Sequence, residues 1–401
     1  MGAFYRIRFV ESYFISYLRY SIMIQYRIES VGVLMKKIIF ILTLVMIFSS
    51  LIAYGETMEE VPYLTEKAIV LEAGPVVDSP MEDFDGQTQY VTAKVISGKY
   101  KGQIFEIQND LSNNEAYDII VKNGDKIIVM IEEYDGGANV FVADYARGDY
   151  ILYLTILFVA LILIIGKSKG VKAIISLGLT VISVIYILLP LVLKGANPVP
   201  ISILISIGVT IITIFLVGGI NSKSIAAIIG TSVGVIIAGG ISYLVGMKIK
   251  LTGLSAEEAT MLMYIPQNIT FNFKNLLFSG IILGALGAVM DVGMSVASSI
   301  DEIHKANTSL TQKELFASGM NVGKDVMGTM TNTLILAYTG SSIPILLLFM
   351  AYETSIIKII NLDIIATEIV RSLSGSIGLV LTIPITALVA SILIKRDKDK
   401  N

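Results

Sequence analysis

Two aspartates in largely apolar surroundings are the residues of this sequence with the clearest potential for chemistry. Asp291 lies in the small-residue run Ile281–Ser299, and Asp325 precedes the apolar run that leads to Tyr338. The two settings resemble each other weakly, Asp291-Val-Gly-Met-Ser against Asp325-Val-Met-Gly-Thr. A carboxylate inside or at the edge of a membrane helix is costly, so each is a candidate for a place in an ion or proton pathway. The structural alternatives are a helix-end carboxylate facing the cytoplasm for Asp291 and a cap of the following helix for Asp325.

Further polar residues extend this candidate pathway. They are Thr329, Thr331, Asn332, Glu353 and Arg371. The two threonines and the asparagine stand at the mouth of an apolar run, where they could line a hydrated path. Hydrogen bonds between helices, at about 0.6–2 kcal/mol each, are the alternative explanation. Arg371 follows Glu368 by three residues, a spacing at which both side chains share a helix face and can pair.

The composition places these residues in a membrane protein. The chain has 401 residues, of which 54% are hydrophobic and 16% are charged, whereas soluble domains carry roughly 25% charged residues. The net charge of −3 and the lack of a basic cluster with interleaved aromatics exclude a nucleic-acid partner. We therefore expect an integral membrane protein with a smaller soluble part, and the lipid bilayer is its first partner.

The residue types exclude several kinds of enzyme and cofactor site. Cysteine is absent and His304 is the only histidine, so thiolate catalysis, disulfides and thiolate or imidazole-rich metal sites are excluded. The settings of Asp291 and Asp325 lack the Tyr-Asp and Gly-x-Gly-Asp patterns of intramembrane aspartyl proteases. We expect a protein that is not an enzyme and has no cofactor and no metal.

The N-terminal part has the form of a secretory signal. Residues 35–55 contain two lysines, an apolar core and then small residues, which predicts a signal peptide or, if it is not cleaved, a signal anchor. Signals rarely begin so deep in a chain. Residues 1–34 are therefore interpreted as a dispensable extension, with Met35 as the true start.

Residues 56–149 alternate between short apolar segments and turns. The predicted strands are Lys67–Glu72, Tyr90–Ile96, Gln103–Ile107, Lys126–Ile131 and Asn139–Ala143. Turn signals such as Asn123-Gly124-Asp125 separate them. This pattern predicts a small, strongly curved extracytoplasmic β domain of OB or SH3-like type.

Residues 150–394 predict an all-α polytopic bundle. Seven apolar runs are long enough to cross a hydrocarbon core of about 30 Å: Tyr150–Ile165, Val171–Leu193, Val199–Ile220, Ser224–Val245, Leu276–Ala297, Thr331–Ala351 and Gly375–Ile394. Small-residue spacings such as Gly230 to Gly234 and Gly280 to Gly284 allow helices to approach closely. Thr311 to Glu314 is a capping-box pattern that predicts a helix start.

The loops predict the orientation of the bundle. If the β domain is outside, the inner loops and the tail 395–401 carry more lysine and arginine than the outer loops, as the positive-inside rule requires. The signal-like segment gives the same orientation independently. We expect a multi-pass cell-membrane protein with a cytoplasmic C-terminus.

Three stretches carry a resemblance to a known family. The runs Gly284–Ser299, Asp325–Thr333 and Arg371–Gly378, together with the order of parts, resemble the bacterial YibE/F family. The resemblance covers roughly residues 56–394. It implies a polytopic membrane protein, often suspected of transport, without established substrate or catalytic residues.

These observations favour a secondary transporter or permease component for an unknown small solute or ion. The alternative is a non-transporting envelope scaffold or sensor that acts through the β domain. A second copy of the chain and a paralogous membrane protein are the protein partners that we consider.

Overall fold

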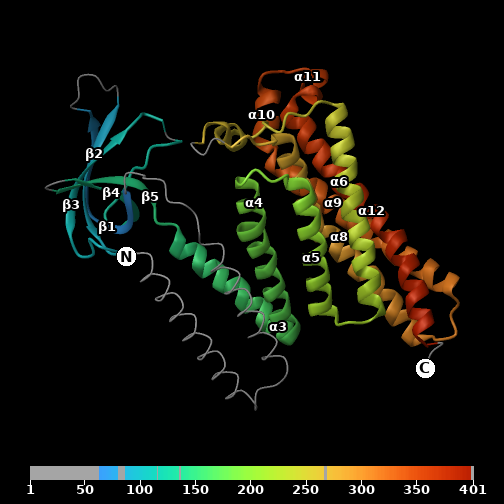
Figure 1. The fold of residues 1–401 in the computed structure, drawn as a ribbon. Helices are drawn as coiled ribbons and strands as arrows, with labels where there is room; N and C mark the ends of the chain where they lie inside the picture. Colours follow the sequence, from blue (N-terminus) through green and yellow to red (C-terminus); the bar gives the residue numbers. More distant parts are fainter. Residues whose placement is uncertain (1–62, 80–85, 115, 135–136, 266–268, 399–401) are drawn as a thin grey trace, which may run out of the picture. The chain divides into compact units, whose positions relative to one another are not determined.

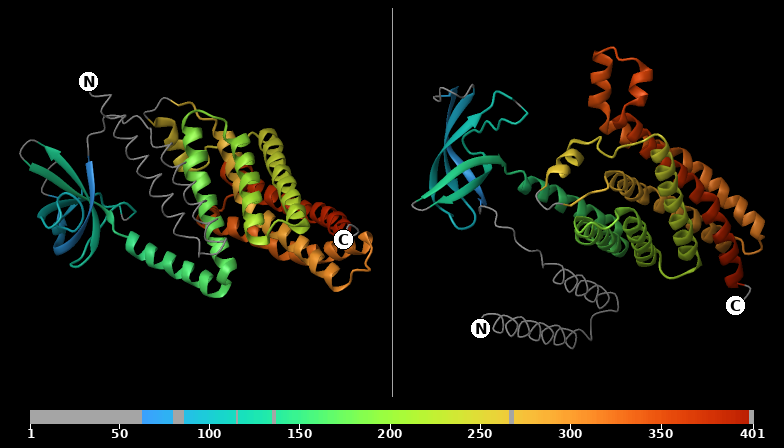
Figure 2. Two further views of the ribbon diagram at one scale, coloured as in Figure 1. Left: turned by 60° about the horizontal axis from the view of Figure 1, so that its bottom comes forward. Right: turned by 45° about the horizontal axis from the view of Figure 1, so that its top comes forward.

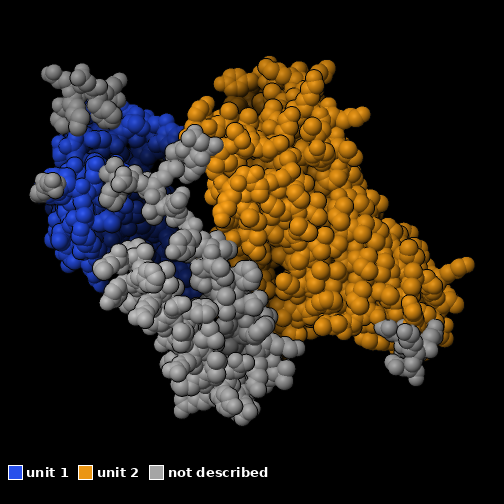
Figure 3. All heavy atoms as spheres, in the orientation of Figure 1, with its two compact units in different colours: residues 1–157 blue, residues 158–401 orange. Residues whose placement is uncertain are grey.

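The computed structural model describes residues 63–79, 86–114, 116–134, 137–265 and 269–398 of the chain. The chain divides into two compact units, residues 1–157 and 158–401 (Figure 3). The expected extension 1–34 and the signal segment 35–55 lie outside the described residues.

The first unit contains one antiparallel sheet (Figure 1). Its strands are β1 (Tyr63–Asp78), β2 (Gln87–Val95), β3 (Ile104–Leu111), β4 (Lys126–Tyr134) and β5 (Gly137–Tyr145). They are ordered β3-β2-β1-β4-β5, and β3 also contacts β5. Two register shifts in β1, at Val70/Glu72 and Ala73/Val76, are of the kind that bends a strand. The five predicted strands are confirmed as parts of a half-barrel.

The core of this half-barrel follows the alternation of the strands. Ala68 and Val70 of β1 are buried beside Ala93 and Val95 of β2. Gln89 is a buried polar exception, and its side chain accepts a hydrogen bond from Val121 N at 3.0 Å and donates one to Val121 O at 2.9 Å. It thus satisfies the backbone of Val121 in the connection between β3 and β4.

The rest of the described chain is helical. The helices are α3 (Gly148–Ser183), η1 (Val184–Leu188), α4 (Leu189–Leu193), α5 (Pro198–Gly218), α6 (Ser222–Lys248), α7 (Glu257–Met261), η2 (Leu262–Tyr264), α8 (Phe273–Ala306), α9 (Gln312–Ser341), α10 (Ile343–Ala351), α11 (Ile356–Asn361) and α12 (Asp363–Lys398). Among the described residues, five helical segments are long and apolar enough to cross a membrane. The count is up to six if the bent pair α9–α10 is one span.

The expected first two spans lie within the segment Gly148–Leu193, as helices on either side of a kink. Lys167 interrupts its helical geometry with φ 48° and ψ −126°, a left-handed φ that L-residues rarely adopt. The expected sixth span is divided differently, because its residues belong to the end of α9 and to α10, which meet at an angle of 59°. Figure 2 shows α10 and α11 projecting together from the end of the bundle.

Glycines let α6, α8 and α12 pack closely at the centre of the bundle. A Cβ on Gly234 of α6 would meet the Thr382 hydroxyl and would lie 2.9 Å from the Gly378 carbonyl oxygen of α12. A Cβ on Gly293 of α8 would lie 2.6 Å from the Thr231 hydroxyl of α6. The spacing Gly230 to Gly234 therefore serves packing within the chain. Gly280 is different, since no atom of the part of the chain that the structure describes lies within 4 Å of a Cβ at that position.

This contrast predicts opposite effects of the same substitution. Gly234→Ala should lower the free energy of unfolding by about 1–3 kcal/mol, because backbone atoms cannot yield to the added methyl group. Gly280→Ala, the matched control, should be neutral or stabilising by up to about 1 kcal/mol. Thermal unfolding of both variants in one detergent checks the prediction, and equal shifts would contradict it.

Candidate polar pathway in the helical bundle

Helix α9 carries most of the predicted site residues. Thr311 accepts a hydrogen bond from Glu314 N at 3.3 Å, and Glu314 accepts one from Thr311 N at 2.7 Å. This confirms the predicted capping box, which starts a helix that continues to Ser341. Asp325 therefore lies in the helix interior, and its interpretation as a cap of a helix into Thr331 is wrong.

The contacts between α9 and α12 show which parts of the two helices lie at the same level of the bundle. A Cβ on Gly319 would lie 3.3 Å from the Ala387 Cβ of α12, and Gly323 packs directly on Ile383. Further along, Leu334 approaches Gly375. The segment of α12 between these contacts carries no charged residue. The segment of α9 from Gly319 to Leu334 therefore packs beside the uncharged segment of α12, at the same depth in the bundle.

The opposite face of α9 is polar and exposed. Its members are Asn321, Lys324, Asp325, Gly328, Thr329, Asn332 and Thr333. We call this set the open face of α9. No ion pair joins Lys324 or Asp325 to another described residue within 4.0 Å. Charged groups at membrane depth face water or a polar partner rather than lipid, so this face requires one or the other.

Asp291 occupies a similar place on α8. It lies well inside α8, far from both ends, so its interpretation as a helix-end carboxylate is wrong. Its side chain is exposed, as are Gly284, Gly287 and Ser295 on the same helix face. A Cβ on Gly284 would lie 2.9 Å from the Tyr338 hydroxyl of α9. This exposed side of α8 therefore borders α9, and Asp291 lies two turns further along it.

Thr331 and Arg371 are half-buried instead. The Thr331 hydroxyl is buried and makes no hydrogen bond to a described residue. Arg371 of α12 forms the predicted pair with Glu368, with an Nη1 to Oε1 distance of 2.9 Å. The Arg371 guanidinium also lies 5.8 Å from the centre of the Tyr338 ring. Tyr338 thus links the Arg371 pair to the exposed side of α8, a connection that sequence spacing did not indicate.

Glu353 is separate from this group. It follows α10, it is exposed, and its backbone has a φ of 48°. Among the described residues, no hydrogen bond or ion pair joins its side chain to the open face of α9 or to Arg371. Among the described residues there is also no group of three His, Cys, Asp or Glu side chains that could hold a metal ion.

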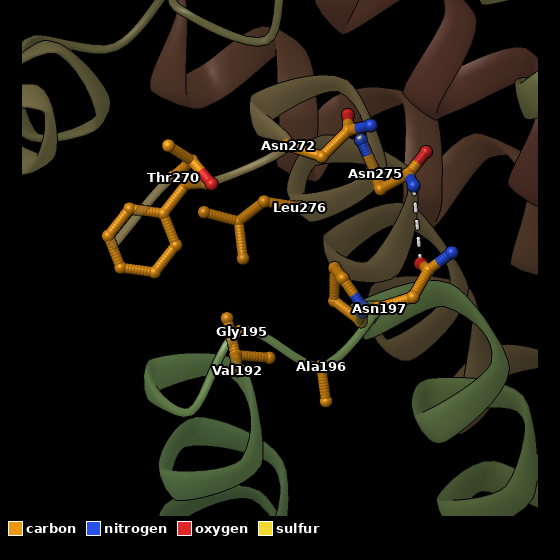
Figure 4. Close-up of a pocket in the computed structure, with 10 residues that line it drawn as sticks. Val192, Gly195, Ala196, Asn197, Thr270, Asn272, Asn275 and Leu276 are labelled. Carbon is orange, nitrogen blue, oxygen red and sulfur yellow. Dashed lines mark hydrogen bonds between the residues drawn. The ribbon is translucent and has the colours of Figure 1, made fainter. Parts of the chain in front are cut away.

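A pocket of about 180 Å³ lies where α5 and α8 begin (Figure 4). Asn197 and Asn272 cap these two helices, and Asn275 Nδ2 donates a hydrogen bond to Asn197 Oδ1 at 3.2 Å. The lining is otherwise mostly small or apolar. None of the predicted site residues lines it. The signal that could have found these asparagines is their place just before apolar helices, which is typical of N-caps.

A second polar cluster lies where the β domain continues into α3, inside the first unit. Asp149 accepts from Lys67 Nζ at 2.8 Å and from Lys126 Nζ at 2.9 Å. The hydrogen bond to Asp149 raises the pKa of the Lys126 ammonium. The carboxylate in the first turn of α3 is thus held by two strands, β1 and β4, which pair with each other.

A half-barrel domain followed by long apolar helices with internal charges defines a membrane protein with a soluble N-terminal domain. Comparison with protein families agrees with this class. A family model described as YibE/F-like protein matches residues 154–396, and one described as YibE/F family N-terminal domain matches residues 65–145. The chain belongs to the YibE/F family, as its motifs indicated. No curated protein and no solved structure matches it.

Proposed function

We propose that this protein is a secondary transporter or permease component that moves a small solute or ion along the open face of α9. One observation carries the proposal: Lys324 and Asp325 are exposed on a helix that packs against the uncharged part of α12. Lipid cannot solvate such groups, so water or a hydrated solute is the natural occupant of this face. Asp291 on the neighbouring helix adds a second carboxylate at the border of the path.

The chemistry of the path favours a cationic or proton-coupled cargo. Asp291 and Asp325 offer carboxylates, while Thr329 and Asn332 offer oxygen atoms that could replace part of a hydration shell. Neither aspartate forms an ion pair with a lysine or arginine among the described residues of its own chain. The protein carries out no covalent chemistry and holds no cofactor in this proposal.

The proposal includes the arrangement of the chain in the membrane. We infer seven spans, because the break at Lys167 divides Gly148–Leu193 into two pieces. The order of the strands and the contact between β3 and β5 support an OB-type barrel. The lysine bias of the loops supports an extracytoplasmic β domain and a cytoplasmic C-terminus in the cell membrane. In intact cells, an impermeant maleimide should then label Lys94→Cys and spare Arg396→Cys; the opposite pattern would refute this topology.

Charge movement in proteoliposomes tests transport itself. The full-length protein is adsorbed on a solid-supported membrane and exposed to concentration jumps of protons, alkali cations, magnesium, carboxylates and amines. We expect at least one jump to evoke a current that Asp325→Asn removes and Glu353→Gln retains. Currents that match those of protein-free liposomes for every jump would refute ion-coupled transport by this chain.

A sensor function is the second candidate, and the contacts of Asp149 favour it. Two lysines of the β domain form ion pairs with Asp149 in the first turn of α3. A force or a ligand that shifts the sheet would therefore also shift the start of this membrane helix. For a sensor, Asp149→Asn should abolish signalling with the β domain still folded. For a transporter it should leave the solute-evoked current measurable, and this difference distinguishes the two functions.

A further inference from the structure

Six of the exposed residues of α9 are spaced as in a helix–helix seam. Asn321, Asp325, Gly328, Asn332, Ile335 and Thr339 are all exposed and follow one another by four, three, four, three and four residues. This alternation is the seven-residue pattern by which one helix faces another. Most of its members are small or polar, the residue types that hold helices together in membranes. No described helix of the same chain covers them.

We propose that a second copy of this chain covers the seam, with the two α9 helices side by side about a two-fold axis along the membrane normal. Both copies insert with the same orientation, so their α9 helices run parallel. Each seam residue then faces the same residue of the other copy. Gly328 permits a close approach, since no atom of the described residues lies within 4 Å of a Cβ there.

Charge complementarity favours a second copy over lipid or an unrelated helix. Lys324 immediately precedes Asp325, and in a parallel pair the residue before a seam position lies beside the seam residue of the other helix. Lys324 thus lies beside the partner's Asp325, and the partner's Lys324 lies beside Asp325. The four charges neutralise one another at membrane depth. Asn332 can donate its amide to the partner's Asn332, as polar seam residues do.

This pairing also completes the proposed path. Among the described residues, a single chain leaves the open face of α9 without a second wall. Two copies cover its seam residues, so the path runs beside the seam, past Thr329 and Thr333. The location of the path between two copies rests on the proposed function. The pairing of the α9 helices does not, so the two can fail separately.

Cysteine cross-linking of the full chain in native membranes tests the pairing, and the absence of native cysteine leaves no background. Gly328→Cys and Asn332→Cys should convert most of the protein to a covalent dimer under mild oxidation. Ile377→Cys and Leu381→Cys are the controls, because these α12 residues are exposed and lie between the contacts that α12 makes with Gly323 and Leu334 of α9. The controls should stay monomeric. Gly328→Cys and Asn332→Cys that dimerise no more than the controls would overturn the proposal.

A charge exchange tests the proposed ring of charges. In the Asn332→Cys background, Lys324→Asp should reduce the cross-linked fraction, because four carboxylates would then meet. Adding Asp325→Lys to Lys324→Asp should restore it. An unchanged dimer fraction in Lys324→Asp would refute the charge contact. A dimer without current would refute transport alone, and an Asp325-dependent current without cross-linking would refute the pairing alone.

Discussion

Asp325→Asn is expected to abolish the solute-evoked current while leaving the thermal stability of the monomer fold nearly unchanged. The carboxylate is exposed on α9 and lies apart from any ion pair among the described residues, so folding gains little from its charge. Asparagine keeps the shape and hydrogen-bonding capacity but can neither carry a charge nor exchange a proton. Current and unfolding temperature are measured on the same preparation. The same result is expected for Asp291→Asn, and partial current is expected for Asp291→Glu.

Asp301→Asn is the matched control for these variants. Asp301 lies on α8 like Asp291, but its carboxylate is within 3.2 Å of Lys223 Nζ and 2.8 Å of Lys305 Nζ. Its removal leaves Lys223, a largely buried partner on α6, without its counter-charge. We therefore expect a loss of about 1–3 kcal/mol in stability and retention of current in proportion to folded protein. Full current in Asp325→Asn would exclude an essential carboxylate at that position.

The second large effect is expected at Arg371. Arg371→Met removes the partner of Glu368, and the Oε2 atom of Glu368 is already buried without a hydrogen bond to a described residue. We expect the free energy of unfolding to fall by about 1–3 kcal/mol, because a partly buried carboxylate is left without its counter-charge. The contact with the Tyr338 ring is lost as well. Chemical unfolding of the purified protein measures the change.

A double-mutant cycle separates the pair from other effects of Arg371. Arg371→Met combined with Glu368→Gln should cost less than the sum of the single substitutions, with an interaction energy of about 0.5–3 kcal/mol. Tyr338→Phe serves as a control that keeps the ring beneath the guanidinium. Strict additivity of Arg371→Met and Glu368→Gln would show that the 2.9 Å contact contributes nothing to stability.

Sequence patterns predicted those features of the structure that depend on residues close together in the sequence. The capping box at Thr311 and Glu314 and the Glu368–Arg371 pair each need only a spacing of three residues, which the sequence displays directly. The strands follow from alternation and the membrane class from apolar run length. The strand order could not be predicted, because β1 pairs with β4 across a long stretch of chain.

The roles of the two aspartates depended on information that the sequence does not display. Sequence alone left open whether Asp325 capped a helix, because the start of α9 could not be placed relative to Asp325. Which face of α9 is open depends on Gly319 and Gly323 resting against α12, a contact between distant segments. The asparagine-capped pocket likewise joins Asn197 to Asn275. The break at Lys167 lies between Gly166 and Gly170, in the gap between the first two predicted apolar runs.

Reactivity of single cysteines along α9 tests most directly whether its open face is hydrated. Thr329→Cys and Thr333→Cys, which lie beside the proposed seam, are treated in native membranes with a charged methanethiosulfonate, which reacts with thiolates in water. Lys313→Cys at the exposed start of α9 is the positive control, and Leu381→Cys on α12 is the lipid-facing control. We expect Thr329→Cys and Thr333→Cys to react far faster than Leu381→Cys. If both are as unreactive as Leu381→Cys while Lys313→Cys is labelled, no hydrated path follows this face and the proposed transport function is wrong.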